Sequence, residues 1–308
     1  MAAVIVTYNP VPGAFDGVLA ALRPQVEQIV IVDNGSVSAT ADALRLLAER
    51  HDCIFVQLSH NLGIAIAQNR GVERIANEAS WKSNSERHYF LFLDHDSIAA
   101  SDMVERLVAS DGRLRAAGNA VGALGPVIVD KRTGTRGRFI CSGRKVWLSR
   151  KACRPGEREM AVEFLISSGT LVRADVLADI GGMNDELFID HVDTEWCLRA
   201  LNRGYKLFAV SGAQLTHSLG DEVVEVWMGR PREVFVHSPL RDYYMCRNTI
   251  LLLRRVPMRF AWRAFLFVRL LGSMAFFGLG VRPRGTRLLR MAQGVRDGCV
   301  GRGGRAAL

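Results

Sequence analysis

Two aspartates separated by one residue end an apolar segment early in the chain. The segment reads YFLFLDHDS, residues 89–97, and it places Asp94 and Asp96 directly after side chains suited to a buried strand. Paired carboxylates at a strand end form an oxygen-rich site, which suits Mg²⁺ or Mn²⁺ held together with substrate phosphates. The same residues also fit a simpler interpretation, in which Ser97 or Asp96 caps a following helix.

The elements that must position these carboxylates alternate regularly over the first hundred residues. Apolar segments predict strands, with helical patterns between them, in AAVIVTY (2–8), EQIVIVDNGS (27–36), CIFVQLS (53–59) and HYFLFLDHDS (88–97). This alternation predicts an α/β fold with a mostly parallel, Rossmann-like sheet and helices on both faces. Ligands of such sheets bind outside the carboxyl ends of the strands. We therefore expect Asp94 and Asp96 to lie at the rim of a cleft.

Charge divides the chain into two parts. The 308 residues carry a net charge of +9, and from Arg241 onward there are fourteen arginines and only two aspartates. The tail therefore carries +12 and the first 240 residues −3, which predicts a slightly acidic body followed by a basic, helical region over 241–308. Apolar residues make up 49% of the chain, which excludes wholesale disorder.

The cysteines and the N-terminal sequence indicate in which cellular compartment the protein is expected. The six cysteines show neither CxxC nor paired spacing, so we expect reduced thiols and no zinc site. The opening MAAVIVTYNP lacks a basic region, and its apolar run is too short for a signal peptide. These features favour a cytoplasmic protein.

Beyond these patterns, the sequence resembles the inverting glycosyltransferases of family 2, which have a GT-A-type fold. It is most similar there to rhamnosyltransferases of bacterial cell-surface polysaccharide assembly. The resemblance covers roughly residues 3–255 and lies in VIVTYNP, IVDNGS, NLGIAIAQNRG, FLDHDS, SSGTLVRADV, GGMNDELFIDHVDTEWCLRALNRGY, THSLGD and RDYYMCRNTILLLRR. The rhamnosyl likeness rests mainly on FIDHVDTEWCLRA and YYMCRN.

The resemblance implies a catalytic domain over residues 1–240. It also implies transfer of L-rhamnose from dTDP-L-rhamnose to a lipid-linked glycan. A different donor, such as UDP-galactofuranose or a UDP-hexose, stays open, as does a non-catalytic nucleotide-sugar-binding protein. A sugar-1-phosphate nucleotidyltransferase shares such a sheet, but it needs a Gly-rich phosphate loop after the first strand, and TYNPVPGAF is not one.

The resemblance also implies which residues contact the donor and the metal. Those expected against the base, ribose and diphosphate are Thr7, Tyr8, Asn9, Asp33, Asn61, Gly63, Asn69, Asp94 and Arg247. Among them Asp33 would bind the base ring, and Arg247 would be a second cation for the diphosphate. Asp96 and His217 would hold Mg²⁺ or Mn²⁺. Without the resemblance, these residues also fit plain turns, a structural histidine and a membrane-facing arginine.

An inverting transfer needs a carboxylate that removes the proton of the acceptor hydroxyl. The resemblance places this base at Asp193, in the segment FIDHVDTEWCLRA, with Val192 where the family often has glutamate. Asp190 is the alternative base. Because a helix N-terminus stabilises a carboxylate, we expect the base to stay ionised near neutral pH. Gly169 and Trp196 are expected on the acceptor side, with Trp196 either against a sugar ring or in the core.

The basic tail contains a long apolar stretch, RFAWRAFLFVRLLGSMAFFGLGV, residues 259–281. Arg263 and Arg269 lie within it, and an arginine at the centre of a bilayer costs about 2.5–3.5 kcal/mol on insertion scales. The pattern therefore predicts a helix lying in the interface of an anionic membrane, on its cytoplasmic side. A core helix packed on the catalytic body is the alternative. No recognition motif supports a nucleic-acid partner.

Overall fold

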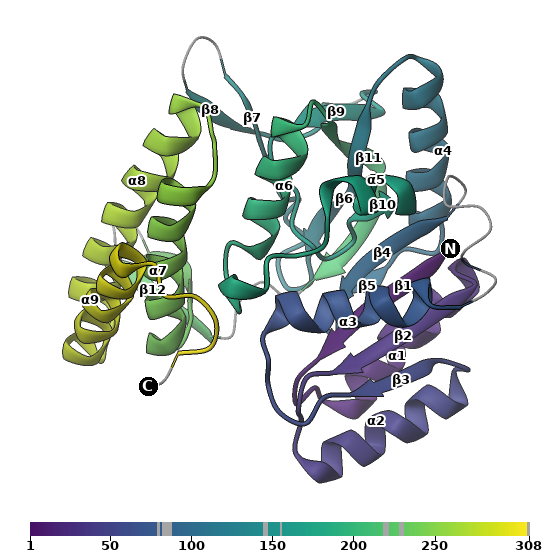
Figure 1. The fold of residues 1–308 in the computed structure, drawn as a ribbon, viewed down its shortest axis with the longest axis horizontal. Helices are drawn as coiled ribbons and strands as arrows, with labels where there is room; N and C mark the ends of the chain where they lie inside the picture. The colour runs from purple at the N-terminus through teal and green to yellow at the C-terminus, as the bar shows by residue number, and fades with distance from the viewer. Residues whose placement is uncertain are drawn as a thin grey trace.

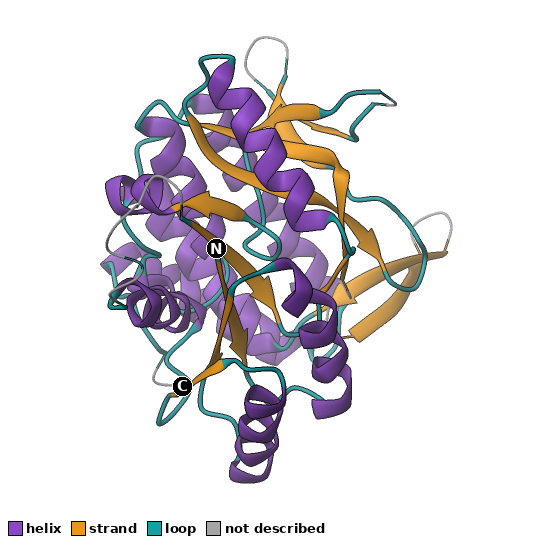
Figure 2. Cartoon of the chain, turned by 90° about the vertical axis from the view of Figure 1, so that its right-hand side faces the viewer, coloured by secondary structure: helices purple, strands orange, loops and turns teal. Residues whose placement is uncertain are grey.

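A mixed β-sheet forms the centre of the molecule (Figure 1). The computed structural model describes residues 1–78, 81, 88–143, 147–154, 156–217, 222–227 and 231–306. Within them the main sheet has the strand order β3-β2-β1-β4-β10-β6-β11-β5, and β9 pairs with β11. Helices lie on both sides of this sheet (Figure 2), as the sequence predicts.

The first part of the chain forms parallel βαβ units. Its elements are β1 (Ala2–Thr7), α1 (Pro12–Leu22), η1 (Arg23–Gln25), β2 (Gln28–Asp33), α2 (Ser38–Arg50), β3 (Ile54–Gln57), α3 (Ile64–Ala76) and β4 (Tyr89–Asp94). Alternate residues of β1 enter two separate cores, because side chains of a strand point to opposite faces. Val4 belongs to one core and Ile5 to the other, and both are essentially buried. A continuous apolar run is therefore required in this strand.

The middle of the chain adds antiparallel strands to the sheet. Its elements are β5 (Ile98–Ala99), α4 (Met103–Ala116), β6 (Val121–Asp130), β7 (Phe139–Ser142), β8 (Leu148–Lys151), β9 (Glu159–Val162), β10 (Leu171–Arg173), α5 (Ala174–Ile180), η3 (Asp185–Leu187), α6 (Val192–Asn202), β11 (Lys206–His217), β12 (Glu222–Trp227) and β13 (Pro231–Val236). Strand β10 lies antiparallel between β4 and β6, whereas β11 runs parallel to β6. The sheet is therefore mostly parallel but mixed.

Strand register brings the polar strand ends together. Thr7 pairs with Asp33 and Val6 with Asp94, so β1, β2 and β4 end side by side. Strand β5 pairs antiparallel with the end of β11, which places His217 beside the segment that follows β4. Helix α4 begins at Met103, well after the aspartate pair, so the helix-cap interpretation of Asp96 and Ser97 is wrong.

The C-terminal part is helical, with α7 (Pro239–Arg255), α8 (Phe260–Ala275), a π-helical turn η4 (Phe276–Gly280) and α9 (Arg284–Val300). The predicted boundary at residue 240 falls in the first turn of α7. Helices α7 and α9 approach closely, since a Cβ added to Gly294 would lie 2.4 Å from the Tyr243 carbonyl oxygen. A buried ion pair of 2.5 Å between Arg287 and Asp242 also joins them.

Helix α8 packs on the body of the molecule along one side. Trp262, Leu266 and Leu270 are buried against the body, and the Trp262 indole donates to Glu163 over 3.2 Å. On the opposite side Phe267 is 53% and Leu271 51% exposed. By length and composition, α8 with η4 is a helix able to cross a membrane, and only 17% of its apolar window is buried. It therefore packs on the body and also presents an apolar face to the outside.

Candidate active site

Three ligand-type side chains converge at the predicted rim of the sheet. One ligand atom each from Asp94, Asp96 and His217 lies within 4.8 Å of the others. His217 Nδ1 is 3.2 Å from Asp96 Oδ1 and 2.8 Å from the Ser97 hydroxyl. The Asp94 amide donates to Ser168 Oγ over 3.0 Å, which fixes the chain where β4 ends. The last residues of β4 and β11 thus form one cluster.

The electrostatics of this cluster suit a divalent cation. Burial raises the pKa of Asp94. Burial also tends to raise the pKa of Asp96, but the hydrogen bond and charge of His217 outweigh it and lower that pKa. Two carboxylates suit Mg²⁺ and Mn²⁺, and an imidazole nitrogen favours the transition metal. The residues present therefore fit the predicted metal, with Asp94 as a ligand in addition to Asp96 and His217.

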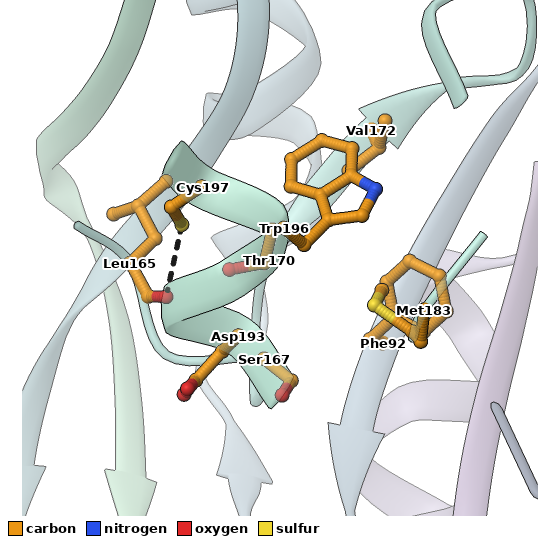
Figure 3. Close-up of a pocket in the computed structure, with 9 residues that line it drawn as sticks. All are labelled: Phe92, Leu165, Ser167, Thr170, Val172, Met183, Asp193, Trp196 and Cys197. Atoms are coloured by element: carbon orange, nitrogen blue, oxygen red, sulfur yellow. Dashed lines mark hydrogen bonds between the residues drawn. The ribbon is translucent and has the colours of Figure 1, made fainter. Parts of the chain in front are cut away.

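Asp193 lies in the first turn of α6, beside an apolar pocket (Figure 3). The pocket is lined by Phe92, Leu165, Ser167, Thr170, Val172, Met183, Asp193, Trp196 and Cys197. The pKa of Asp193 is raised to about 6, mainly by burial and also by the charges of Asp190 and Asp94, while a hydrogen bond of 2.8 Å from the Thr194 amide acts in the opposite direction. Desolvation therefore opposes the stabilisation that the helix N-terminus gives to the carboxylate. Above pH 7 the carboxylate is still mostly ionised, and a pKa near the working pH suits a general base.

Asp190 is held differently from Asp193. Its carboxylate forms an ion pair of 2.6 Å with Arg241, and its φ of +64° is in the left-handed region. Within the described part of the chain, the Asp193 carboxylate has no ion pair. Asp193 is therefore the better placed of the two candidate bases, and Asp190 lies beside it, close enough to raise its pKa.

The loop before α6 is held by α7, through a residue that the sequence analysis overlooked. Asn248 Nδ2 donates to the carbonyl oxygens of Leu187 at 2.7 Å, Ile189 at 2.8 Å and Asp190 at 2.9 Å. Phe188, Asp190 and His191 have positive φ values, which are unfavourable for residues other than glycine. The loop therefore needs the hydrogen bonds from Asn248 to keep this conformation. The only sequence signal was the Arg-Asn pair in YYMCRN.

Arg247 is a correction to the predicted donor site. It is completely buried, and its guanidinium donates to the carbonyl oxygens of Gly304 at 2.5 Å, Glu186 at 3.1 Å and Leu187 at 3.2 Å. A guanidinium engaged in this way cannot contact a diphosphate in the groove. Arg247 instead joins the C-terminal segment to the loop that leads to Asp190 and Asp193.

The two residues expected on the acceptor side, Trp196 and Gly169, have close contacts within the protein. Trp196 is only 3% exposed, and its indole donates to the Gly181 carbonyl oxygen over 2.9 Å, so the core alternative holds. Gly169 has a φ of +83°, and a Cβ there would lie 2.6 Å from Pro126 Cγ. Glycine is therefore required by the backbone turn beside Ser168.

Among the donor-side residues, those at the ends of β1 and β2 are packed closely. Asp33 is completely buried and accepts hydrogen bonds from Thr7 Oγ1 at 3.3 Å and from the Ser36 hydroxyl at 2.5 Å. A base ring would therefore reach Asp33 only after the Ser36 hydroxyl turns away. Tyr8 is half-exposed, and Asn9 accepts from the Val37 amide over 2.9 Å, so both lie at the accessible edge.

Contacts within the protein also hold the second group of expected donor-side residues. Asn69 exchanges hydrogen bonds with the Met183 backbone at 2.8 and 2.9 Å and donates to Asp185, so it joins α3 to the loop before α6. A Cβ on Gly63, whose φ is +93°, would lie 2.6 Å from the Phe188 carbonyl oxygen. Both residues therefore hold the loop before α6 close to α3, and their contact with the donor stays a prediction. Asn61 is partly exposed and bonds the Gly63 amide at 3.0 Å. Residues 218–221 of THSLGD lie outside the described residues.

Comparison with known sequences identifies the family. The profile described as "Glycosyl transferase family 2" matches residues 2–181. The dTDP-rhamnosyl transferase RfbF of Shigella flexneri is 34% identical over 268 residues, which cover 86% of this chain and 84% of that protein. The poly-beta-1,6-N-acetyl-D-glucosamine synthase of Staphylococcus aureus (strain COL) is 24% identical over 251 residues, and the match spans 77% of this chain and 53% of the synthase.

Solved structures share the fold at lower identity. S. aureus TarS 1-349 in complex with UDP-GlcNAc aligns with a TM-score of 0.55 and 16% identity, covering 96% of this chain and 80% of that one. GalNAc-T7 with UDP, GalNAc and Mn2+ aligns with a TM-score of 0.56 and 13% identity, covering 89% of this chain and 57% of that longer one. On its profile match and its 34% identical relative, this chain belongs to glycosyl transferase family 2 and has the GT-A-like fold.

Proposed function

We propose that this glycosyltransferase transfers L-rhamnose from dTDP-L-rhamnose, with inversion, to a lipid-linked saccharide in cell-surface polysaccharide synthesis. The observation that carries the proposal is the alignment with a dTDP-rhamnosyl transferase over most of both chains. The site supports it, because a candidate metal cluster lies beside a carboxylate whose pKa of about 6 suits a general base.

Each step of the proposed reaction is assigned to particular residues. Asp94, Asp96 and His217 would hold the divalent ion, which neutralises charge on the departing diphosphate when it is bound. Asp193 takes the proton of the acceptor hydroxyl as that oxygen forms a bond to the anomeric carbon. The bond from the anomeric carbon to the diphosphate oxygen breaks on the opposite face. Arg241 holds Asp190 away from the proton transfer through their ion pair.

Thermal unfolding with a panel of nucleotides and nucleotide sugars tests the donor. With Mg²⁺, dTDP-L-rhamnose is expected to raise the melting temperature more than UDP-GlcNAc, UDP-galactofuranose or UDP-glucose. A ligand at a hundred times its Kd stabilises the native state by about 2.7 kcal/mol. Samples without Mg²⁺ serve as the control. A larger shift with a UDP-sugar would reassign the donor, and no shift with any of them would reject a nucleotide-sugar site.

We further propose that the apolar face of α8 lies on an anionic membrane at the cytoplasmic side. Phe260, Phe267, Val268 and Leu271 are exposed, and α9 adds exposed Leu288 and Leu289. The C-terminal part, from Arg241 onward, also carries a net charge of +12, compared with −3 for the first 240 residues. An apolar face flanked by arginines is typical of helices that lie at an anionic interface.

The double substitution Phe267→Asp with Leu271→Asp is expected to release the protein from liposomes that contain phosphatidylglycerol. Each apolar side chain contributes about 1.5–3 kcal/mol when it leaves water, so the loss of affinity should exceed tenfold. Liposome sedimentation measures it. Leu46→Asp, at an exposed apolar position on α2, is the matched control and should pellet like the wild type. Undiminished pelleting of the double variant would reject this membrane face.

A further inference from the structure

The chain after α9 turns back toward the sheet (Figure 1), and residues 301–306, the C-terminal segment, pack on the loop before α6. The Gly304 amide donates to the Glu186 carbonyl oxygen over 2.6 Å, and the Gly304 carbonyl oxygen accepts from Arg247 over 2.5 Å. A Cβ added to Gly303 would lie 2.7 Å from Glu186 Cβ, so the two chains are in close contact. The segment is therefore fixed to this loop through its backbone.

The end of the C-terminal segment is also anchored. The Ala306 amide donates to Tyr244 Oη over 2.9 Å, and Ala306 packs against the buried aromatic cluster that contains Tyr244 and Phe188. Arg305 lies between Ala306 and the anchored Gly304. Its backbone position is therefore defined by both neighbours, although the residue itself is exposed.

Arg305 lies at the donor side of the sheet rim. Its Nη1 donates to the Asn61 carbonyl oxygen over 3.4 Å. Asn61 follows β3, and its side chain accepts a hydrogen bond of 3.2 Å from Asn34, the residue after Asp33. Among the residues that the structure describes, Arg305 has no ion pair and no other hydrogen bond. Most of its N–H groups are thus available at the edge where the nucleotide is expected.

The loop that holds the C-terminal segment also touches the donor side. The Ile64 amide donates to the Phe188 carbonyl oxygen over 2.7 Å, so this loop contacts the start of α3. In the proposed reaction the donor extends from Asp33, at the nucleoside, to Asp193, at the reacting carbon, and its diphosphate lies between them. Arg305 lies where these two parts of the site meet.

We propose that Arg305 binds the diphosphate of the donor nucleotide. This inference rests on the proposed function. A guanidinium forms charge-assisted hydrogen bonds with phosphate oxygens, because its N–H groups match their geometry. The buried Arg247 cannot take this role, since it is bound to the Gly304 carbonyl oxygen. Arg247 thus fixes the C-terminal segment, and the exposed Arg305 contacts the ligand.

Binding of dTDP to the full-length protein in the presence of Mg²⁺ tests the proposal. Isothermal titration calorimetry should show binding to Arg305→Gln weakened about tenfold or more, because charge-assisted hydrogen bonds are lost. Arg302→Gln is the matched control, since Arg302 lies in the same segment, is 68% exposed and pairs with Asp297 of α9 at 3.4 Å. It should bind dTDP like the wild type. Unchanged melting temperatures would show that both variants fold.

Further titrations decide which part of the nucleotide Arg305 contacts. Thymidine lacks the diphosphate and should bind the wild type and Arg305→Gln equally, whereas their difference for dTDP should shrink at high salt. Equal binding of dTDP by the two proteins would overturn the proposal. An equal loss for thymidine would also overturn it, by placing the contact on the nucleoside. If the wild type binds UDP but not dTDP, the proposed donor fails, and UDP replaces dTDP in the same comparison. If it binds neither, both proposals fail.

Discussion

The Asp193→Asn protein is expected to transfer sugar about 10²–10⁴-fold more slowly than the wild type, the range typical of a lost general base. The amide has nearly the same shape but cannot accept the acceptor proton. Binding of dTDP should stay near the wild-type value, since the metal cluster is intact. Steady-state turnover and calorimetry with dTDP measure the two effects. Turnover equal to that of the wild type would eliminate Asp193 as the base.

The pH dependence of kcat/KM tests the role of Asp193 independently. Because the pKa of Asp193 is raised to about 6, the base is protonated below that pH, and kcat/KM should fall there with decreasing pH. The Asp193→Asn variant should lack this inflection. Burial penalises the ionised carboxylate only in the folded state, so at pH 7.5 the variant should unfold at a temperature no lower than the wild type.

Asp190→Asn distinguishes the two candidate bases. Its carboxylate is held by Arg241, so its replacement should cost less activity than that of Asp193. The inflection in the pH profile should remain and move to lower pH, because a negative charge that raises the pKa of Asp193 is removed. A larger loss in Asp190→Asn than in Asp193→Asn would exchange the two roles.

Removal of the metal ligand Asp96 is expected to have the second large effect. A bound ion is worth several kcal/mol of charge stabilisation in the transition state, so Asp96→Ala should lower metal-dependent turnover by about a thousandfold. Treatment of the wild type with EDTA should give a similar loss, which Mg²⁺ or Mn²⁺ restores. Turnover as a function of metal concentration measures both effects.

Asp102→Ala is the matched control for that substitution. Asp102 is also an aspartate in the segment between β4 and α4, and its side chain is 42% exposed compared with 41% for Asp96. It pairs with Arg106 on the surface and lies outside the metal cluster, so its replacement should leave turnover unchanged. Full activity of Asp96→Ala in the presence of EDTA would remove the metal from the proposed reaction.

Local sequence predicted much of the sheet and of the metal cluster. Buried parallel strands require continuous apolar runs, and their ends must carry the polar residues that face the cleft. For this reason the strand containing Asp94 could be located before any coordinates were known. The antiparallel strand β10 was less apparent, because three residues, Leu171–Arg173, give too short a pattern for strand direction to be inferred.

The roles of individual polar side chains depended on packing. Arg247, Trp196 and Asn69 have the chemical groups of ligand-binding residues, but each is hydrogen-bonded to backbone atoms far away in sequence. Burial of such groups requires partners, and those partners come from other elements that local spacing does not reveal. The same holds for Asn248, whose three carbonyl partners lie about sixty residues earlier.

The amino-acid sequence by itself determined the α/β class, the order of the strands along the chain and the carboxylates at their ends, because these follow from local periodicity. Only the tertiary structure decided the pKa of Asp193, through its burial and the charges of Asp190 and Asp94. Desolvation and the influence of neighbouring charges depend on distances through space. Those distances are set by how α6 packs on the sheet.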